Sequence, residues 1–428
     1  MKRLNIAIIG LGNIGSHLFT YLKDNKKILM EKNNCMPIVK YVSAKNRKRK
    51  RSININKKLW LKNYLEATKI KDIDLIVELI GGSEGAAKKL VFEALKNKKH
   101  VVTANKALMA KYGDELAKIA EKNNVNLEFE ASVCGGVPIV RLLKEGLIAN
   151  KISKIYGIFN GTSNYILSSM DKENKSFDDV LFDAKKLGYA ESNPTADLNG
   201  DDVSSKLKIL TSLCFNSFLN NKIYVEGIKE IDKTDIDITN KLGYKIKLLG
   251  FAELLGKKIY QRVHPTLIKK ESHVASIDGV LNAVIVDGNP IGQSIIQGEG
   301  AGPAATTSAL ISDISSVLRG NTKFPFSISN KERKKLKFED IKDRNFSAYL
   351  RFEVIDTQGV LSNITNIFTK NKVSIKRLIQ NPDKIKKTSS IIVITHNAKD
   401  KYLNKILKEV SKKNYIKRKP KLIRIDDN

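Results

Sequence analysis

The chain has 428 residues, more than one hydrophobic core usually organises, so two or three domains are expected. Its 76 Lys and Arg against 45 Asp and Glu give a net charge of +31, but the lysines are spread along the whole chain without a nucleic-acid-reading motif, so no nucleic-acid partner is predicted. Neither a bilayer-spanning apolar run nor a cleavable leader pattern is present, which predicts a cytoplasmic protein without a membrane partner.

Residues 1–131 alternate short apolar runs with helical patterns. Five runs are rich in β-branched residues and bounded by turn residues, as strands are: 4–10, 37–43, 74–80, 100–104 and 125–131. The stretches between them have helical periodicity: 14–30, 84–97 and 107–123. This alternation predicts βαβ units, and therefore an α/β fold that begins with a Rossmann-type, doubly wound parallel sheet.

A glycine-rich turn follows the first predicted strand and opens a helix. It reads Gly10-Leu11-Gly12-Asn13-Ile14-Gly15. In this position Gly10 permits the tight turn, Gly12 lets the backbone approach a pyrophosphate, and Gly15 allows close packing of helix and strand. The helix N-terminus then offers free N–H groups to the phosphates. These six residues are therefore predicted to bind a dinucleotide.

The end of the second predicted strand bears on the choice of cofactor. NAD sites place Asp or Glu there, whereas NADP sites supply a cation for the extra phosphate. After Ser43 the chain reads Ala44-Lys45-Asn46-Arg47-Lys48-Arg49-Lys50-Arg51, without a carboxylate. This favours NADP(H), with Lys45 as a phosphate ligand, and leaves NAD(H) open. The competing interpretation is a solvated basic loop in a lysine-rich chain.

The rest of the chain is predicted to form two further domains. Residues 132–320 contain predicted helices followed by predicted strands, as in an α+β substrate-binding and catalytic domain: helices at 162–171, 177–187 and 201–214, and strands at 247–255, 258–264 and 281–287. A glycine-rich segment at 298–302 then opens a last helix. Residues 321–346 are charged and poorly patterned, which predicts a linker. Residues 347–428 have the strand–helix–strand–strand–helix–strand order of a ferredoxin-like domain.

Two segments carry residue types that suit carbonyl reduction. Lys106 follows a predicted strand end, and such ends face the ligand crevice of a doubly wound sheet. A second segment, 188–206, supplies four carboxylates and a lysine: Glu191, Asp197, Asp201, Asp202 and Lys206. Carboxylates suit the ammonium group of an amino-acid substrate, and a lysine suits the alkoxide formed when hydride reaches an aldehyde carbon. The competing interpretation of Asp202 and Lys206 is an exposed pair four residues apart on one helix.

Longer motifs resemble a known family. They are Glu78 to Gly82, Thr103 to Lys106, Glu130 to Pro138, Gly161 to Leu167, and GYAESNPTADLNGDDVSSKLKIL at 188–210. Together they resemble the homoserine dehydrogenase family over residues 4–320. The resemblance implies reversible, NAD(P)H-dependent reduction of L-aspartate 4-semialdehyde to L-homoserine in threonine and methionine biosynthesis, by a homodimer or homotetramer.

The resemblance also implies roles for single residues. Lys206 and Lys106 become proton-transfer candidates, without a choice between them, and Glu191, Asp197 and Asp202 bind or orient the substrate. Two glycines correspond to positions near the cofactor, Gly188 and Gly302, although each also reads as a plain turn glycine. The family often has Asp-Pro where this chain has Asn193-Pro194, so one acidic group is missing.

The segment that starts at Glu130 resembles the family's monovalent-cation loop. The implied ligands of a structural Na⁺ are the Glu130 side chain and the carbonyls of Val133, Gly135 and Val137. Two glycines and a proline suit an irregular backbone that turns carbonyls toward a hard cation. The alternative interpretation is a hinge between two domains.

The tail resembles an ACT domain at its first turn, Asp356 to Leu361. This implies a regulatory domain in which Asp356 and Gly359 bind an amino-acid effector, threonine being the one that the resemblance suggests. The alternative is a tail that mediates subunit contacts only.

The sequence leaves two rival functions open. Cys134 suits a thioester-forming semialdehyde dehydrogenase, which needs an activated thiolate and a nearby base. A degenerate dehydrogenase joined to an ACT domain would instead be a non-catalytic ligand sensor, although the lysines, carboxylates and glycines are intact.

Overall fold

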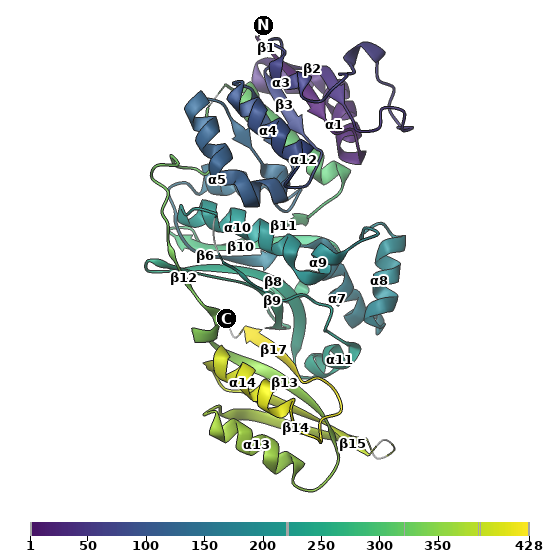
Figure 1. The fold of residues 1–428 in the computed structure, drawn as a ribbon, viewed down its shortest axis with the longest axis vertical. Coiled ribbons are helices and arrows are strands. Elements are labelled where there is room, and N and C mark those ends of the chain that lie inside the picture. Colours follow the sequence, from purple (N-terminus) through teal and green to yellow (C-terminus); the bar gives the residue numbers. More distant parts are fainter. Residues whose placement is uncertain (1, 220–221, 321, 384, 386, 427–428) are drawn as a thin grey trace.

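The computed structural model describes residues 2–219, 222–320, 322–383, 385 and 387–426. Residues 1, 220–221, 321, 384, 386 and 427–428, which belong to the predicted domains and linker, lie outside the described residues. The molecule is elongated, with the N-terminal sheet at one end, a second sheet in the middle and the C-terminal tail at the other end (Figure 1). Among the described helices, none combines the length and the apolar character needed to cross a bilayer.

The first sheet is parallel, as predicted, with strand order β2-β1-β3-β4-β5. Its strands are β1 (Lys2–Ile9), β2 (Cys35–Ser43), β3 (Leu75–Glu78), β4 (His100–Thr103) and β5 (Leu127–Glu128). The connecting helices are α1 (Asn13–Asp24), α2 (Lys26–Asn33), α3 (Glu66–Lys69), α4 (Ala86–Lys96) and α5 (Lys106–Asn123), and η1 (Lys57–Leu59) is a short 3₁₀ turn. The strand order reverses at β1, so the ligand crevice of such a sheet lies at the carboxyl ends of β1 and β3.

Two features of this first layer differ from the sequence-based expectation. The helix expected over 14–30 is two helices, because Asn25 leaves the helical conformation at φ −102° and ψ 17°. The second feature is α12 (Pro303–Leu318), which returns from the middle region and packs on the first sheet. Leu310 and Ile314 are buried there in one core with Leu18 and Val77. Helical periodicity predicted α12 but not which sheet it would cover.

The middle region is built on an antiparallel run of strands, β11-β10-β6-β8-β9. The strands are β6 (Lys151–Ile158), β7 (Tyr224–Val225), β8 (Tyr244–Leu255), β9 (Lys258–Lys269), β10 (Leu281–Asn289) and β11 (Gly292–Glu299). The helices are α6 (Ile139–Arg141), α7 (Gly161–Glu173), α8 (Phe177–Lys186), α9 (Thr195–Asn199), α10 (Asp201–Phe215) and α11 (Lys233–Lys241), with short turns η2 (Glu130–Ser132), η3 (Leu142–Gly146) and η4 (His273–Ser276). β6, β7 and β11 were not predicted. Of these, β11 is a largely exposed strand with few apolar residues, which gives a weak strand pattern.

The tail has the predicted ferredoxin-like order, β17-β13-β15-β14, with neighbouring strands antiparallel. Its elements are β13 (Asn345–Ile355), α13 (Val360–Lys370), β14 (Ile375–Asp383), β15 (Thr388–Thr395), β16 (Ala398–Lys399), α14 (Asp400–Val410) and β17 (Lys421–Asp426). β17 pairs in parallel with β9, with Arg424 opposite Thr266. The middle and tail strands therefore form one continuous sheet.

The charged segment expected to be a linker is packed rather than extended in solvent. Phe326 is fully buried and Arg333 is 5% exposed. Arg333 stacks over Phe326 at 4.1 Å and pairs with Asp114 of α5 at 2.6 Å. β12 (Lys337–Glu339) then pairs with β9, and η5 (Ile341–Asp343) follows it. The composition of this segment predicted a solvated linker, because the few residues that anchor it are scattered among many charged residues.

Candidate active site

The glycine turn lies at the carboxyl end of β1 and has the steric features of a dinucleotide-binding turn. Gly10 has φ +110°, and a Cβ there would lie 2.4 Å from the carbonyl oxygen of Leu79. A Cβ on Gly15 would lie 2.1 Å from the carbonyl oxygen of Gly10. A Cβ on Gly12, the N-cap of α1, would meet nothing within 4 Å. The turn is therefore close-packed at Gly10 and Gly15 and open at Gly12, where a pyrophosphate would approach.

The basic loop after β2 contacts this turn through a residue that the sequence did not single out. Arg51 donates from Nε to the carbonyl oxygen of Leu11 at 2.9 Å. The guanidinium groups of Arg51 and Arg47 lie 5.4 and 5.2 Å from the ring centroid of Trp60. Lys45, the predicted phosphate ligand, is exposed on the same loop. Arg51 is thus the cation held against the glycine turn. In the sequence, only the run of basic residues at 45–51 pointed to it.

Asp202 at the start of α10 joins the two predicted lysines. Lys106 Nζ lies 2.6 Å from its Oδ1, and Lys206 Nζ lies 2.8 Å from its Oδ2. Lys206 also donates to the carbonyl oxygen of Phe159 at 2.6 Å. Asp202 is 4% exposed, so the interpretation of an exposed helix pair is wrong. Lys106 comes from α5 of the first sheet, and the cluster therefore bridges the first sheet and the middle region.

The pKa values in this cluster follow from burial and mutual attraction. Burial opposes the charge on Asp202, but Lys206 and Lys106 outweigh it and hold the pKa of Asp202 well below its usual range. Burial also opposes the charge on Lys206, but Asp202 outweighs it and raises the pKa of Lys206. Asp202 and Lys206 are therefore both charged at neutral pH, so the Lys206 ammonium can face an alkoxide.

Asn160 was missed by the sequence reasoning and ties Asp197 to the cluster. Its Nδ2 donates to Asp197 Oδ1 at 2.7 Å and to Asp202 Oδ2 at 2.9 Å. Its Oδ1 accepts from the backbone N–H of Ser163 at 2.7 Å, which caps α7. Burial, and then the charge of Asp202, raise the pKa of Asp197. The feature of the sequence that could have identified Asn160 was its position directly before the helix that begins at Gly161.

Three other predicted residues lie apart from these contacts. Glu191 is exposed between α8 and α9, and no contact of the described residues joins it to Asp202. Gly188 has φ +78° and follows the C-terminus of α8 as a Schellman turn, with its N–H bonded to Lys185 O and the Tyr189 N–H to Ala184 O. Gly302 has φ +109° and is the N-cap of α12, where a Cβ would meet nothing within 4 Å.

The candidate cation loop lies between the two sheets and is held by its own carboxylate. Glu130 is 1% exposed, and its two oxygens accept the backbone N–H groups of Val140 at 3.0 Å and Arg141 at 2.6 Å. Burial raises the pKa of Glu130 to about 7. The described residues contain no group of three His, Cys, Asp or Glu side chains that could hold a metal. A hard monovalent cation would therefore depend on Glu130 and on carbonyls, including those of Val133, Gly135 and Val137.

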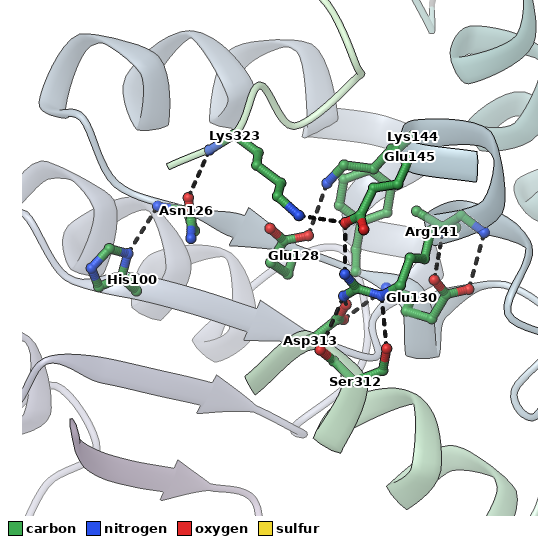
Figure 2. A network of polar contacts seen from close by, with 12 residues as sticks. His100, Asn126, Glu128, Glu130, Arg141, Lys144, Glu145, Ser312, Asp313 and Lys323 are labelled. Carbon is green, nitrogen blue, oxygen red and sulfur yellow. Dashed lines mark hydrogen bonds and ion pairs between the residues drawn. The ribbon is translucent and has the colours of Figure 1, made fainter. Parts of the chain in front are cut away.

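A buried polar network holds this loop in place (Figure 2). Lys144 Nζ lies 2.8 Å from Glu128 Oε2, with both side chains 4% exposed. Arg141 lies 3.3 Å from Asp313 of α12, and Asp313 accepts the backbone N–H of Glu130 at 2.8 Å. The network thus connects β5, the loop, η3 and α12. It makes the segment a rigid connection between the first sheet and the middle region.

Cys134 lies in the same loop but does not have the surroundings of a nucleophile. The residue is fully buried, and burial raises the pKa of its thiol to about 11. A thiol with this pKa is almost entirely protonated at neutral pH, whereas catalytic cysteines have lowered pKa values. The rival interpretation as a thioester-forming enzyme is therefore not favoured.

Comparisons with known proteins match both parts of this arrangement. The family model described as "Homoserine dehydrogenase, NAD binding domain" matches residues 10–130, and the model described as "Homoserine dehydrogenase" matches residues 138–315. Neither model extends over the tail.

Full-length relatives and structures agree with these models. The homoserine dehydrogenases of Neisseria gonorrhoeae and Helicobacter pylori are each 37% identical over 100% of this chain, and 99% and 100% of their own lengths are covered. The crystal structure of a homoserine dehydrogenase from Thiobacillus denitrificans is 35% identical with a TM-score of 0.92, covering 100% of this chain and 99% of that one. A hyperthermophilic archaeal homoserine dehydrogenase mutant in complex with NADPH is 26% identical with a TM-score of 0.63, covering 75% of this chain and 99% of that one.

Proposed function

This chain belongs to the homoserine dehydrogenase family, NAD(P)-dependent oxidoreductases that act on a CH–OH group, and we propose that the cluster around Asp202 is where its substrate reacts. The reaction interconverts L-aspartate 4-semialdehyde and L-homoserine. The observation that carries the proposal is that Lys106 and Lys206 meet on one buried carboxylate beside the crevice of a dinucleotide-binding sheet.

The carboxylates are proposed to bind the substrate ammonium. Asp197 is only partly neutralised, since the contact that supports it is a neutral amide from Asn160. Its raised pKa reflects a charge that burial and Asp202 disfavour. A cation placed beside it would relieve both effects, as the ammonium group of homoserine would. Glu191 stays a candidate for the same role from the exposed segment before α9.

Lys206 is proposed as the proton donor to the alkoxide. Hydride for the aldehyde carbon comes from the reduced nicotinamide when it is bound. Asp202 and the Phe159 carbonyl each accept one N–H of the Lys206 ammonium, so its third N–H has a defined direction. Lys106 is less constrained, because 45% of its side chain is exposed. We assign Lys106 to holding Asp202 and to returning a proton from solvent.

NADP(H) is proposed as the preferred cofactor. The glycine turn supplies the pyrophosphate site through residues 10–15, and Gly188 and Gly302 are proposed to border the cofactor. Lys45 and Arg51 supply cations after β2, where an NAD-selective site has a carboxylate. The NADPH complex of the archaeal relative supports this choice by analogy.

A structural Na⁺ is proposed for the loop at 130–137. The carboxylate oxygens of Glu130 keep lone pairs after accepting two N–H groups, and the neighbouring carbonyls are hard oxygen ligands. Such an ion would fix the loop between the sheets and takes no part in hydride transfer. Its test is the melting temperature in Na⁺ against choline buffers, where a rise specific to Na⁺ is expected.

The tail is proposed to be an ACT-like regulatory domain that binds threonine at the turn of Asp356 and Gly359. Gly359 has φ +83°, which gives the open backbone that the sequence reasoning required. We also propose a homodimer or homotetramer, supported by the edge strand β11 and by Ile291 and Ile295, which are 43% and 40% exposed. Light scattering tests the assembly, and titration with millimolar threonine tests the inhibition.

The decisive assay for the function follows absorbance of reduced nicotinamide with homoserine at alkaline pH. We expect turnover with NADP⁺ exceeding that with NAD⁺. A protein that binds both cofactors but turns over neither would instead be the non-catalytic sensor.

A further inference from the structure

A cavity of about 720 Å³ lies where the tail meets the middle sheet. One wall comes from β7, β9 and the segment 338–342, and the other comes from one face of α14, between Asp400 and Lys408. In Figure 1 this junction lies beside β17, far from the glycine turn. Its size falls in the range of small-molecule sites, which are common at junctions between domains.

A buried amide in this cavity lacks a hydrogen-bond acceptor. Gln261 of β9 is 3% exposed and lines the cavity. Its Oε1 accepts from Thr211 Oγ1 at 2.9 Å. Its Nε2 is buried and finds no partner among the described residues. A buried donor without an acceptor is unfavourable, so an acceptor oxygen on a ligand would be stabilised there.

The remaining lining is apolar inside and positively charged at the rim. Ile223, Val225, Phe338 and Ile341 supply the apolar part. The rim carries Lys222, Lys342 and Lys408, and the described residues provide none of these three with an ion-pair partner. An apolar interior with a positively charged rim favours a ligand that is apolar along its length and anionic at one end.

The acidic residues of the lining do not cancel this charge. Asp400 pairs with Arg424 at 2.7 Å, with both side chains 2% exposed. Asp340 accepts the backbone N–H of Lys342 at 3.0 Å, and Glu339 lies 3.7 Å from Arg344. Asp400 and Glu339 therefore face arginines within the protein and Asp340 keeps its charge, whereas the three rim ammonium groups have no ion-pair partner among the described residues.

We propose that this junction cavity binds a small organic anion, a carboxylate or phosphate ester with an apolar skeleton and a further acceptor oxygen. The anionic group contacts Lys342 and Lys408, the skeleton packs on Phe338 and Ile341, and the acceptor oxygen receives the Nε2–H of Gln261. This site is separate from the turn of Asp356 and Gly359.

Binding at this cavity acts on the helix that carries the reacting groups. Thr211, which holds Gln261, belongs to α10, and α10 also carries Asp202 and Lys206. The two walls are tied together by Arg424 of β17, which pairs with Asp400 of α14 at 2.7 Å and donates to the hydroxyl of Tyr224 on β7 at 3.3 Å. A ligand on Gln261 therefore shifts α10 and changes turnover, a step that rests on the proposed active site.

Calorimetry on the full chain tests the site without any need for turnover. The probe is 4-oxo-4-phenylbutyrate, and its neutral amide is the control for charge. We expect saturable binding of the acid, with affinity at least about tenfold higher than that of the amide. Lys342→Glu and Lys408→Glu should each weaken binding of the acid, while Lys376→Glu, at an exposed lysine on β14, should not. No saturable heat, or equal affinity in all three variants, would overturn the proposal.

The contact of Gln261 is tested by removing the acceptor oxygen from the ligand and, separately, the amide from residue 261. The wild-type protein should bind 4-oxo-4-phenylbutyrate more tightly than 4-phenylbutyrate, and Gln261→Leu should bind the two equally. A preference that survives in Gln261→Leu would remove Gln261 from the site.

Coupling to α10 is read from homoserine oxidation. A saturating probe should change kcat or KM at least about twofold in the wild type and not in Lys342→Glu. Binding without any kinetic change would overturn the coupling. An inactive protein that still binds the probe would overturn the proposed active site and leave the cavity standing.

Discussion

Lys106, the first residue of α5, lies 2.6 Å from Asp202, the second residue of α10, although α5 connects two strands of the first sheet and α10 belongs to the middle region. This contact closes the first sheet onto the middle region at the crevice. A movement of one region against the other would break it, so the geometry of the cluster reports the relative position of the two.

Removing the proposed proton donor should abolish turnover while the fold is retained. For Lys206→Ala we expect kcat to fall at least about a thousandfold, since both proton delivery and alkoxide stabilisation are lost. Steady-state rates in both directions measure this. Lys208→Ala, two residues along the same helix, is the control and should keep its rate. A Lys206→Ala enzyme with wild-type kcat would move the donor role to Lys106.

Lys106→Ala should have a different kinetic signature. The carboxylate of Asp202 would keep Lys206 but lose a cation that holds the two regions together. We expect kcat to fall about ten- to a hundredfold and KM for homoserine to rise, since positioning is lost with partial retention of proton transfer. Lys118→Ala, at an exposed lysine of α5, provides the matched control. Equal kinetics in the two variants would contradict the role given to Lys106.

Asp197 should impose a pH dependence on substrate binding. Burial and Asp202 raise its pKa, so it takes up a proton at a higher pH than an ordinary aspartate does. Protonation removes the charge that binds the ammonium, so KM for homoserine should rise as the pH falls through this raised pKa and reach a plateau above it. Asp197→Asn should show a high KM that no longer changes over this range. Identical KM–pH profiles for the two proteins would exclude Asp197 from ammonium binding.

The basic loop should discriminate between the two cofactors. Arg51→Ala and Lys45→Ala should raise KM for NADP⁺ about tenfold or more and change KM for NAD⁺ little, because only NADP⁺ carries the extra phosphate. Lys58→Ala, at an exposed lysine of η1, serves as the control. An equal rise in KM for both cofactors in Arg51→Ala would indicate that Arg51 only supports the glycine turn through its contact with Leu11.

Two glycines of the turn should behave differently when replaced by alanine. Gly15→Ala places a Cβ 2.1 Å from the Gly10 carbonyl oxygen and should destabilise the fold by about 1–3 kcal/mol. Gly12→Ala meets open space in the protein and should leave the melting temperature unchanged while it weakens cofactor binding. Thermal unfolding with and without NADP⁺ separates the two. Equal melting temperatures for both variants without cofactor would contradict the packing assigned to Gly15.

The sequence by itself determined the parts of this protein that depend on residues close together in the chain. Periodicity and turn residues predicted the βαβ series, the glycine turn, the helix from 201 to 214 and the strand order along the tail. The position of Asp202 and Lys206 on one face of α10 followed from helical spacing alone. Such features are local because each residue's conformation depends mainly on its neighbours within a few positions.

Only the tertiary structure decided which of these parts meet. It brought Lys106 to Asp202, inserted Asn160 between two carboxylates, left Glu191 exposed, returned α12 to the first sheet and paired β17 with β9. These contacts join residues far apart in the chain, and they form because burial of apolar faces and pairing of strand edges are satisfied over the whole molecule at once. A pattern in a short window shows that a helix has an apolar face, but it does not show which surface will cover that face.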